Sequence, residues 1–211
     1  AFALAVLCSL AGCGGSSEDA GPGRAAIPAA DSATVSATGD SGSGRQHQRA
    51  VPLGNTLNTR DLGGYTGDGE RRVRWGLLYR SDSLALLDEA DVATLKALQL
   101  STVTDFRSQS ERDAAPDRLP QQSPPLVYKT LAINDPAVDV AALGKKFYAG
   151  ALSSDELIAL TDRTSYVLDD RLRENWGQWV HDLAQPGALP QMFHCTAGKD
   201  RTGFAAALVL L

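Results

Sequence analysis

The sequence is poor in cysteine and in long apolar stretches. It has three cysteines in 211 residues, and two of them, Cys8 and Cys13, lie in the apolar segment at the N-terminus. No later apolar run approaches the roughly 20 residues of a membrane-spanning helix. Outside the N-terminal segment Cys195 is the single cysteine, so an intramolecular disulfide is excluded there and its thiol needs another explanation.

An excess of basic residues is also lacking. The formal net charge is -5 at pH 7, from 20 Lys and Arg against 25 Asp and Glu. A protein that binds nucleic acid normally presents a clustered basic face, and this composition gives no sign of one. We therefore expect no nucleic-acid partner. Any recognition of phosphate has to depend on a few local residues.

The N-terminal segment resembles part of an export signal. Residues 1–10 are typical of the apolar core of a secretory signal whose start is missing, since the sequence begins without Met. The following Leu-Ala-Gly-Cys at residues 10–13 resembles the lipobox of bacterial lipoproteins. That resemblance implies cleavage before Cys13, lipidation of Cys13, and a membrane-anchored protein on the extracytoplasmic side. An ordinary signal cut elsewhere, or a short hydrophobic tail, remains the alternative for residues 1–13.

Residues 14–50 have the composition of a tether. They are rich in Gly, Ser, Ala, Asp and Thr, and Ile27 and Val35 are their only large apolar residues. Such a segment cannot offset the entropy of ordering by burying apolar surface. We predict a disordered linker between a membrane anchor and a folded domain at residues 51–211.

The pattern of the folded domain predicts an α/β fold with a central, mostly parallel sheet flanked by helices. Asp88 is placed to cap one helix, and Ser153 with Glu156 has the spacing of a capping box. The sequence ends inside an apolar helix, so we expect further C-terminal helices to be missing. The predicted strands are residues 73–80, 101–106, 126–133 and 189–194; the predicted helices are 88–98, most of 135–184, and 199 onward.

The segment between the last predicted strand and helix has the spacing of an anion site. Five residues, including Gly198, separate Cys195 from Arg201. A loop around an oxyanion turns its backbone N–H groups inward, and the start of the following helix adds partial positive charge. The planar guanidinium of Arg201 can hold two phosphoryl oxygens. The same positive environment stabilises a thiolate, which would make Cys195 a nucleophile.

The neighbouring residues have candidate supporting roles. The amides of residues 196–201 can form the cradle, which comprises Thr196, Ala197, Gly198, Lys199, Asp200 and Arg201. The hydroxyl of Thr202 can donate a hydrogen bond to the sulfur, and His194 can orient the loop. Each residue alone also has a structural explanation, such as a buried thiol or a turn glycine. Their joint spacing favours a site.

Four segments together resemble a known family. They are HCTAGKDRTG at residues 194–203, NTRDLGGY at 58–65, LYRSD at 78–82 and TDFRS at 104–108. The first is similar to the signature of the protein tyrosine phosphatase superfamily. All four together resemble the atypical bacterial tyrosine and lipid phosphatases, which include secreted mycobacterial and listerial enzymes.

The resemblance implies a mechanism and a substrate class. Cys195 would be the nucleophile that forms a phosphocysteine, and Arg201 would bind the phosphoryl group. The substrates would be phosphotyrosine or phosphoserine proteins, and the charge of Lys199 extends the range to phosphoinositides. No metal and no cofactor is implied. A surface lipoprotein that binds phosphorylated ligands without turnover is the alternative.

The proton donor for the leaving group is not fixed by the sequence. A general acid speeds the departure of an alkyl or aryl oxide. Asp200, inside the loop, is the first candidate, and Asp105 in the TDFRS segment is the second. Arg60 with Asp61, and Arg80 with Asp82, either approach the site or form structural ion pairs.

Overall fold

The computed structural model describes residues 47–66, 71–135 and 138–211. The expected signal segment at 1–13, with Cys13, and most of the expected tether at 14–50 lie outside these ranges. The sequence predictions for them are not tested by the structure. Among the described residues, no helix has both the length and the apolar character needed to cross a membrane.

A five-stranded sheet forms the centre of the domain, in the order β1-β2-β5-β3-β4. Strand β1 is antiparallel to β2, and the other neighbours are parallel. This arrangement confirms the predicted α/β fold with a mostly parallel sheet. The strands are β1 (Arg60–Asp61), β2 (Leu78–Ser81), β3 (Thr102–Asp105), β4 (Val127–Thr130) and β5 (Gln191–His194).

Seven helices are described, and their capping residues explain where several of them begin. The side chain of Asp88 accepts a hydrogen bond from the amide of Asp91 at the start of α1, as predicted. Ser153 and Glu156 form the predicted capping box of α4. The helices are α1 (Glu89–Ala97), α2 (Gln109–Ala114), α3 (Val140–Tyr148), α4 (Ser154–Thr161), α5 (Ser165–Leu168), α6 (Asp170–Leu183) and α7 (Asp200–Leu210).

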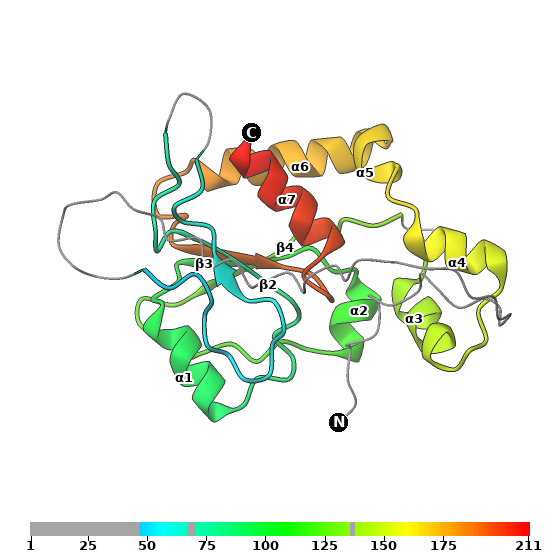
Figure 1. Cartoon of the computed structure of the whole chain (residues 1–211), viewed down its shortest axis with the longest axis horizontal. Helices are drawn as coiled ribbons and strands as arrows, with labels where there is room; N and C mark the ends of the chain where they lie inside the picture. The colour runs from blue at the N-terminus through cyan, green and yellow to red at the C-terminus, as the bar shows by residue number, and fades with distance from the viewer. Residues whose placement is uncertain (1–46, 67–70, 136–137) are drawn as a thin grey trace, which may run out of the picture. The chain divides into compact units, whose positions relative to one another are not determined.

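The two faces of the sheet bury separate apolar cores. Because side chains alternate along a strand, Phe193 of β5 faces one core and Met192 the other. The first core packs α5, α6 and α7 on the sheet and contains Trp176 and Trp179. The second packs α1, through Leu95, on the opposite face. Figure 1 shows α1 and α6 with α7 on opposite sides of the strands.

Two sequence predictions about elements were wrong. The strand expected at residues 73–80 begins only at Leu78, because Gly76 has a φ of +77° that interrupts extended backbone. Trp75 packs instead beneath Gly63, where a Cβ would come within 2.5 Å of it. The predicted pattern also omitted α2, although Ser108 and Glu111 form a second capping box at its start.

The carboxyl ends of three parallel strands meet at one edge of the sheet. His194 of β5 is in register with Ser81 of β2 and with Asp105 of β3. The residues that follow these three therefore lie side by side, and Cys195 is one of them. In open α/β sheets, ligands bind at this edge.

Candidate active site

The loop from Cys195 to Arg201 connects β5 to α7. Cys195 is 2% exposed and is the free thiol of the described residues. Gly198 has a φ of +64°, and a Cβ there would lie 2.7 Å from Asp82 N and from Ser81 O. Only glycine fits both the backbone conformation and this close approach. Packing against the end of β2 thus sets the curvature of the loop.

The guanidinium of Arg201 is held by a carboxylate that the sequence prediction did not include. Its Nη1 and Nη2 donate to Glu111 at 2.8 and 2.7 Å, and Nη1 also donates to Phe106 O at 3.2 Å. Burial favours the neutral forms of both groups. The hydrogen bonds and opposite charges outweigh burial, lowering the pKa of Glu111 to about 2 and raising that of Arg201. The charge of Cys195 also raises the pKa of Arg201.

Arg201 keeps two donors for a ligand. A guanidinium has five N–H groups, and Glu111 with Phe106 takes two from Nη1 and one from Nη2. Among the described residues, none accepts from Nε or from the second N–H of Nη2. These two N–H groups are the side edge of the guanidinium, which can bind two oxygens of one phosphoryl group. The ion pair with Glu111 therefore orients Arg201 and leaves the Nε edge of its guanidinium open for a ligand.

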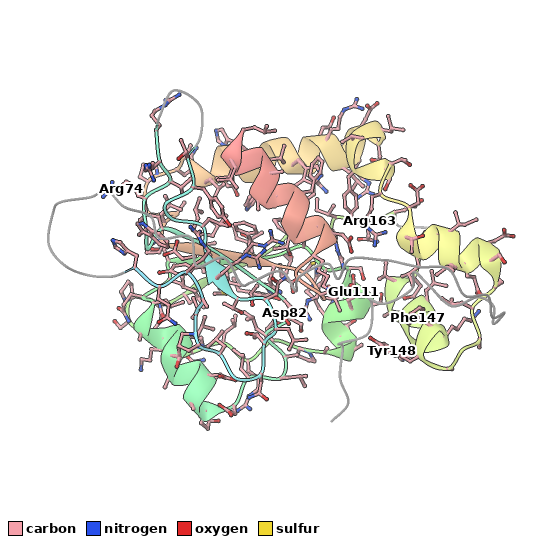
Figure 2. The ribbon with its side chains drawn as sticks, in the orientation of Figure 1. Arg74, Asp82, Glu111, Phe147, Tyr148 and Arg163 are labelled. Atoms are coloured by element: carbon pink, nitrogen blue, oxygen red, sulfur yellow. The ribbon has the colours of Figure 1, made fainter. Side chains whose placement is uncertain are left out.

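Glu111 also fixes the first residue after the thiol. The hydroxyl of Thr196 donates to Glu111 at 2.5 Å, and the amide of Ser108 donates to the same carboxylate at 2.9 Å. One carboxylate, itself 6% exposed, thus connects the start of α2 with both ends of the loop. Figure 2 shows Glu111 on α2, close to the end of α7 where the loop enters.

The carbonyl of Gly198 accepts two hydrogen bonds from outside the loop. Arg80 Nη2 donates at 2.6 Å and Asn58 Nδ2 at 2.7 Å. The structural ion pairs considered for Arg60 with Asp61 and for Arg80 with Asp82 are not formed. In the described part of the chain, neither arginine makes a salt bridge. The segments at residues 58–61 and 78–82 therefore support the loop directly.

Behind the loop lies a buried polar cluster centred on His194. The ring is fully buried, and its Nε2 lies 3.1 Å from a carboxylate oxygen of Asp117, poorly aligned for a hydrogen bond. Its Nδ1 lies 3.4 Å from Cys195 O. Arg107 contacts Asp105 at 2.7 Å and Asp117 at 2.8 Å. This placement fits the expected role of His194 in orienting the loop.

The same cluster holds three side chains of the kinds that bind metal ions. Ligand atoms of Asp105, Asp117 and His194 lie within 4.8 Å of one another. However, the guanidinium of Arg107 already neutralises both carboxylates, and a cation there would be repelled by it. The donor set therefore does not fit a metal ion.

The two candidate general acids have different surroundings. Asp105 is fully buried, and although burial opposes ionisation, His194 and Arg107 hold its pKa below the usual range. Such a carboxylate stays ionised and is a poor proton donor. Asp200 lies in the first turn of α7 with a side chain 51% exposed, and it pairs with Arg163 at 3.1 Å. Figure 2 shows Arg163 between α4 and the start of α7.

A third carboxyl group beside the loop, Asp82, has an unusual environment. It follows β2 at the position next to Cys195, and it is 8% exposed. Its Oδ2 accepts from Leu57 N at 3.0 Å, whereas its buried Oδ1 has no partner. Burial raises the pKa of Asp82, and the backbone hydrogen bonds oppose that rise only in part.

The remaining predicted residues line or support the loop. Thr196 and Ala197 are partly exposed, and Lys199 is exposed at the residue before α7. Thr202 is fully buried, and its hydroxyl has no hydrogen-bond partner in the structure. The predicted hydrogen bond from that hydroxyl to the sulfur of Cys195 is not formed here.

Comparisons with known proteins give relatives of this chain. The model of the tyrosine phosphatase family matches residues 51–211. A Cupriavidus necator protein named as a tyrosine-protein phosphatase is 35% identical over 170 residues, which are 72% of this chain and 54% of that protein. The triple specificity protein phosphatase PtpB of Mycobacterium tuberculosis is 30% identical over 174 residues, 75% of this chain and 62% of that protein.

The chain thus spans a little more than half the length of these two relatives. Among solved structures, P. aeruginosa TpbA matches 65% of this chain and 60% of its own with 24% identity. Its TM-score is 0.29, so no argument about the site is drawn from it.

Proposed function

The chain belongs to the tyrosine phosphatase family, and from this premise we propose that it hydrolyses phosphate monoesters through a phosphocysteine intermediate. The thiolate of Cys195 attacks phosphorus, so a P–S bond forms while the P–O bond to the leaving group breaks. Water then attacks the phosphocysteine, which releases inorganic phosphate and restores the thiolate. Neither step consumes a metal or a redox cofactor.

The observation that carries the proposal is the state of Arg201. Glu111 fixes the guanidinium at 2.7 and 2.8 Å and leaves the Nε edge open, next to Cys195. A phosphoryl group held by that edge and by the loop amides would lie over the sulfur. Charge that develops on its oxygens in the transition state would meet donors already in place.

Proton donation to the leaving oxygen is assigned to Asp200. Its carboxyl is exposed in the first turn of α7, directly after the loop. Asp105 is less suited because its salt bridge to Arg107 keeps it ionised and away from solvent. Asp82, buried beside Cys195 with a raised pKa, is the alternative donor that the geometry adds.

The substrates we propose are phosphotyrosine and phosphoserine proteins and phosphoinositides. The exposed charge of Lys199 beside Arg201 supports polyanionic substrates. The name of the M. tuberculosis relative, a triple specificity protein phosphatase, supports a broad range. We also propose that the domain is anchored through lipidated Cys13 on the extracytoplasmic side of a bacterial membrane.

The test is phosphate release from phosphotyrosine peptides and phosphoinositides by the full chain and by Cys195→Ser. We expect turnover by the wild type and none by the variant, since serine is a far weaker nucleophile at neutral pH. Equal rates would refute the mechanism. Binding without turnover in both forms would favour the alternative of a lipoprotein that only binds phosphorylated ligands.

A further inference from the structure

Two adjacent arginines beside the loop have no acidic partner among the residues that the structure describes. Arg60 of β1 is directly opposite Arg80 of β2 in antiparallel register, an arrangement that is destabilising for like charges. Arg80 is 9% exposed, and its Nε has no hydrogen-bond partner. Burial and then the charge of Arg60 lower the pKa of Arg80 to about 10. Among the described residues, no carboxylate forms a salt bridge with either arginine, so the pair concentrates positive charge beside the loop.

The carboxylates of Asp61 and Asp82 accept hydrogen bonds from backbone amides. Asp61 accepts from Gly63 N and Gly76 N, both at 2.7 Å. Asp82 accepts from Leu57 N at 3.0 Å. Among the described residues, neither carboxylate forms a salt bridge with Arg60 or Arg80, and Arg60 lines the cavity described next.

A cavity of about 390 Å³ lies beside this pair, within the roughly 300–1,000 Å³ usual for small-molecule sites. Residues 49–51 and 56–60 line it, so Arg49 and Arg60 are both among its lining residues. Arg49 is held by Asp61 O at 2.9 Å and lies over the ring of Tyr65 at 4.0 Å.

Hydrogen bonds connect this cavity to the catalytic loop. Arg60 Nη1 donates to Asn58 through both the main-chain and the side-chain oxygen. Asn58 Nδ2 in turn donates to Gly198 O at 2.7 Å. Arg60 is therefore two hydrogen bonds from the loop that would hold the reacting phosphoryl group.

We propose that Arg60 and Arg49, supported by Arg80, form a second anion subsite, which binds an additional phosphate of a polyphosphorylated inositol head group. This subsite rests on the proposed function, because its ligand reacts at Cys195 through another phosphate. The rigid ring carries both phosphates close together, which suits a subsite joined to the loop through a single side chain. Guanidinium groups bind such dianions in two-point contacts.

The experiment compares short-chain phosphatidylinositol monophosphate and bisphosphate as substrates of the full chain. We expect a higher kcat/KM for the bisphosphate. In Arg60→Gln, the ratio of the two kcat/KM values should fall about tenfold, the effect of one charge-assisted hydrogen bond. The matched control is Arg173→Gln on α6, whose arginine pairs with Asp170, and its ratio should not change.

Three results would overturn the subsite. The first is an unchanged ratio in Arg60→Gln, and the second is an equal loss on both substrates, which indicates a purely structural role. The third is that the enzyme prefers doubly over singly phosphorylated peptides but does not prefer the bisphosphate lipid over the monophosphate lipid. If Arg60→Gln does not fold, as judged by thermal unfolding, Arg49→Gln carries the same test with an expected loss of about threefold.

Direct binding separates failure of the subsite from failure of the proposed function. If the wild type hydrolyses nothing, the proposed function is wrong, but titration calorimetry of Cys195→Ser with inositol bisphosphate still tests the subsite. Adding Arg60→Gln should weaken that binding about tenfold. Unchanged affinity would refute the subsite.

Discussion

The ion pair between Glu111 and Arg201 makes a quantitative prediction about stability. The pKa of Glu111 is lowered from an ordinary 4.5 to about 2, because Arg201 and Thr196 stabilise the carboxylate more than burial destabilises it. A difference of that size corresponds to about 3 kcal/mol of unfolding free energy. Removing one partner from a buried pair costs a similar amount, roughly 3–5 kcal/mol. We therefore expect Glu111→Gln to destabilise the domain by about 3 kcal/mol at pH 7.

The pH dependence follows from the direction of the shift. Because the folded pKa is depressed, the contribution of Glu111 is fully present above about pH 4.5 and is lost as the pH falls toward 2. The difference in stability between wild type and Glu111→Gln should therefore fall to about half of its neutral value near pH 3. Asp105 titrates in both proteins, so its own acid sensitivity cancels in the difference.

Urea denaturation at pH 7, 5, 4 and 3 measures this difference. The control is Glu89→Gln, which removes a pair with Arg118 from a side chain that is 88% exposed. Exposed pairs contribute about 0–1 kcal/mol, so this variant should stay near the wild type at every pH. A difference between Glu111→Gln and wild type that stays constant from pH 7 to 3 would refute the assignment of Glu111 as the ionised partner of Arg201.

Three further predictions concern the loop, the proton donor and the anchor. Gly198→Ala should abolish phosphate release and lower the unfolding free energy by about 1–3 kcal/mol, because its Cβ would lie 2.7 Å from backbone atoms. Gly177→Ala, in open space on α6, should instead gain about 0.5–1 kcal/mol, and similar thermal stability of the two variants would contradict the packing argument. Asp200→Asn should slow hydrolysis of alkyl phosphates more than of activated aryl phosphates in steady-state assays. Equal losses would show that another residue is the proton donor. Cys13→Ala should move the protein from the membrane to the soluble fraction, and unchanged membrane association on fractionation would remove the lipid anchor.

Local sequence signals predicted the parts of the fold that depend on local chemistry. The short apolar run at residues 189–194 identified β5, and the caps at Asp88 and Ser153 located the starts of α1 and α4. The same capping signature at Ser108 and Glu111 was available and would have predicted α2. The prediction of a strand from residue 73 was wrong because Trp75 in that segment packs against Gly63, and such tertiary packing is not visible in the local sequence.

The supporting residues of the site could not be predicted in the same way. Glu111 contacts Arg201 across 90 residues of sequence, and Arg80 contacts Gly198 across 118. No periodicity links such positions, since the order of strands in the sheet creates the proximity. The spacing of Cys195 and Arg201 is local because one loop must surround one phosphoryl group, and for that reason it was visible.

The distribution of charge around the loop explains how a chain with a formal net charge of -5 could act on anions. Glu111 pairs with Arg201, and two aspartates pair with Arg107. These ion pairs hold both guanidinium groups in place and leave no net positive charge at either. Among the described residues, no carboxylate pairs with Arg60 or Arg80; Arg60 lines the cavity, and Arg80 donates to Gly198 O. The unpaired positive charge is therefore concentrated where a second anionic group of a substrate would be. If this charge distribution serves binding, raising the ionic strength should strongly weaken the preference for bisphosphate over monophosphate. It should weaken turnover of the monophosphate less, because exposed charges are screened more strongly than buried ones.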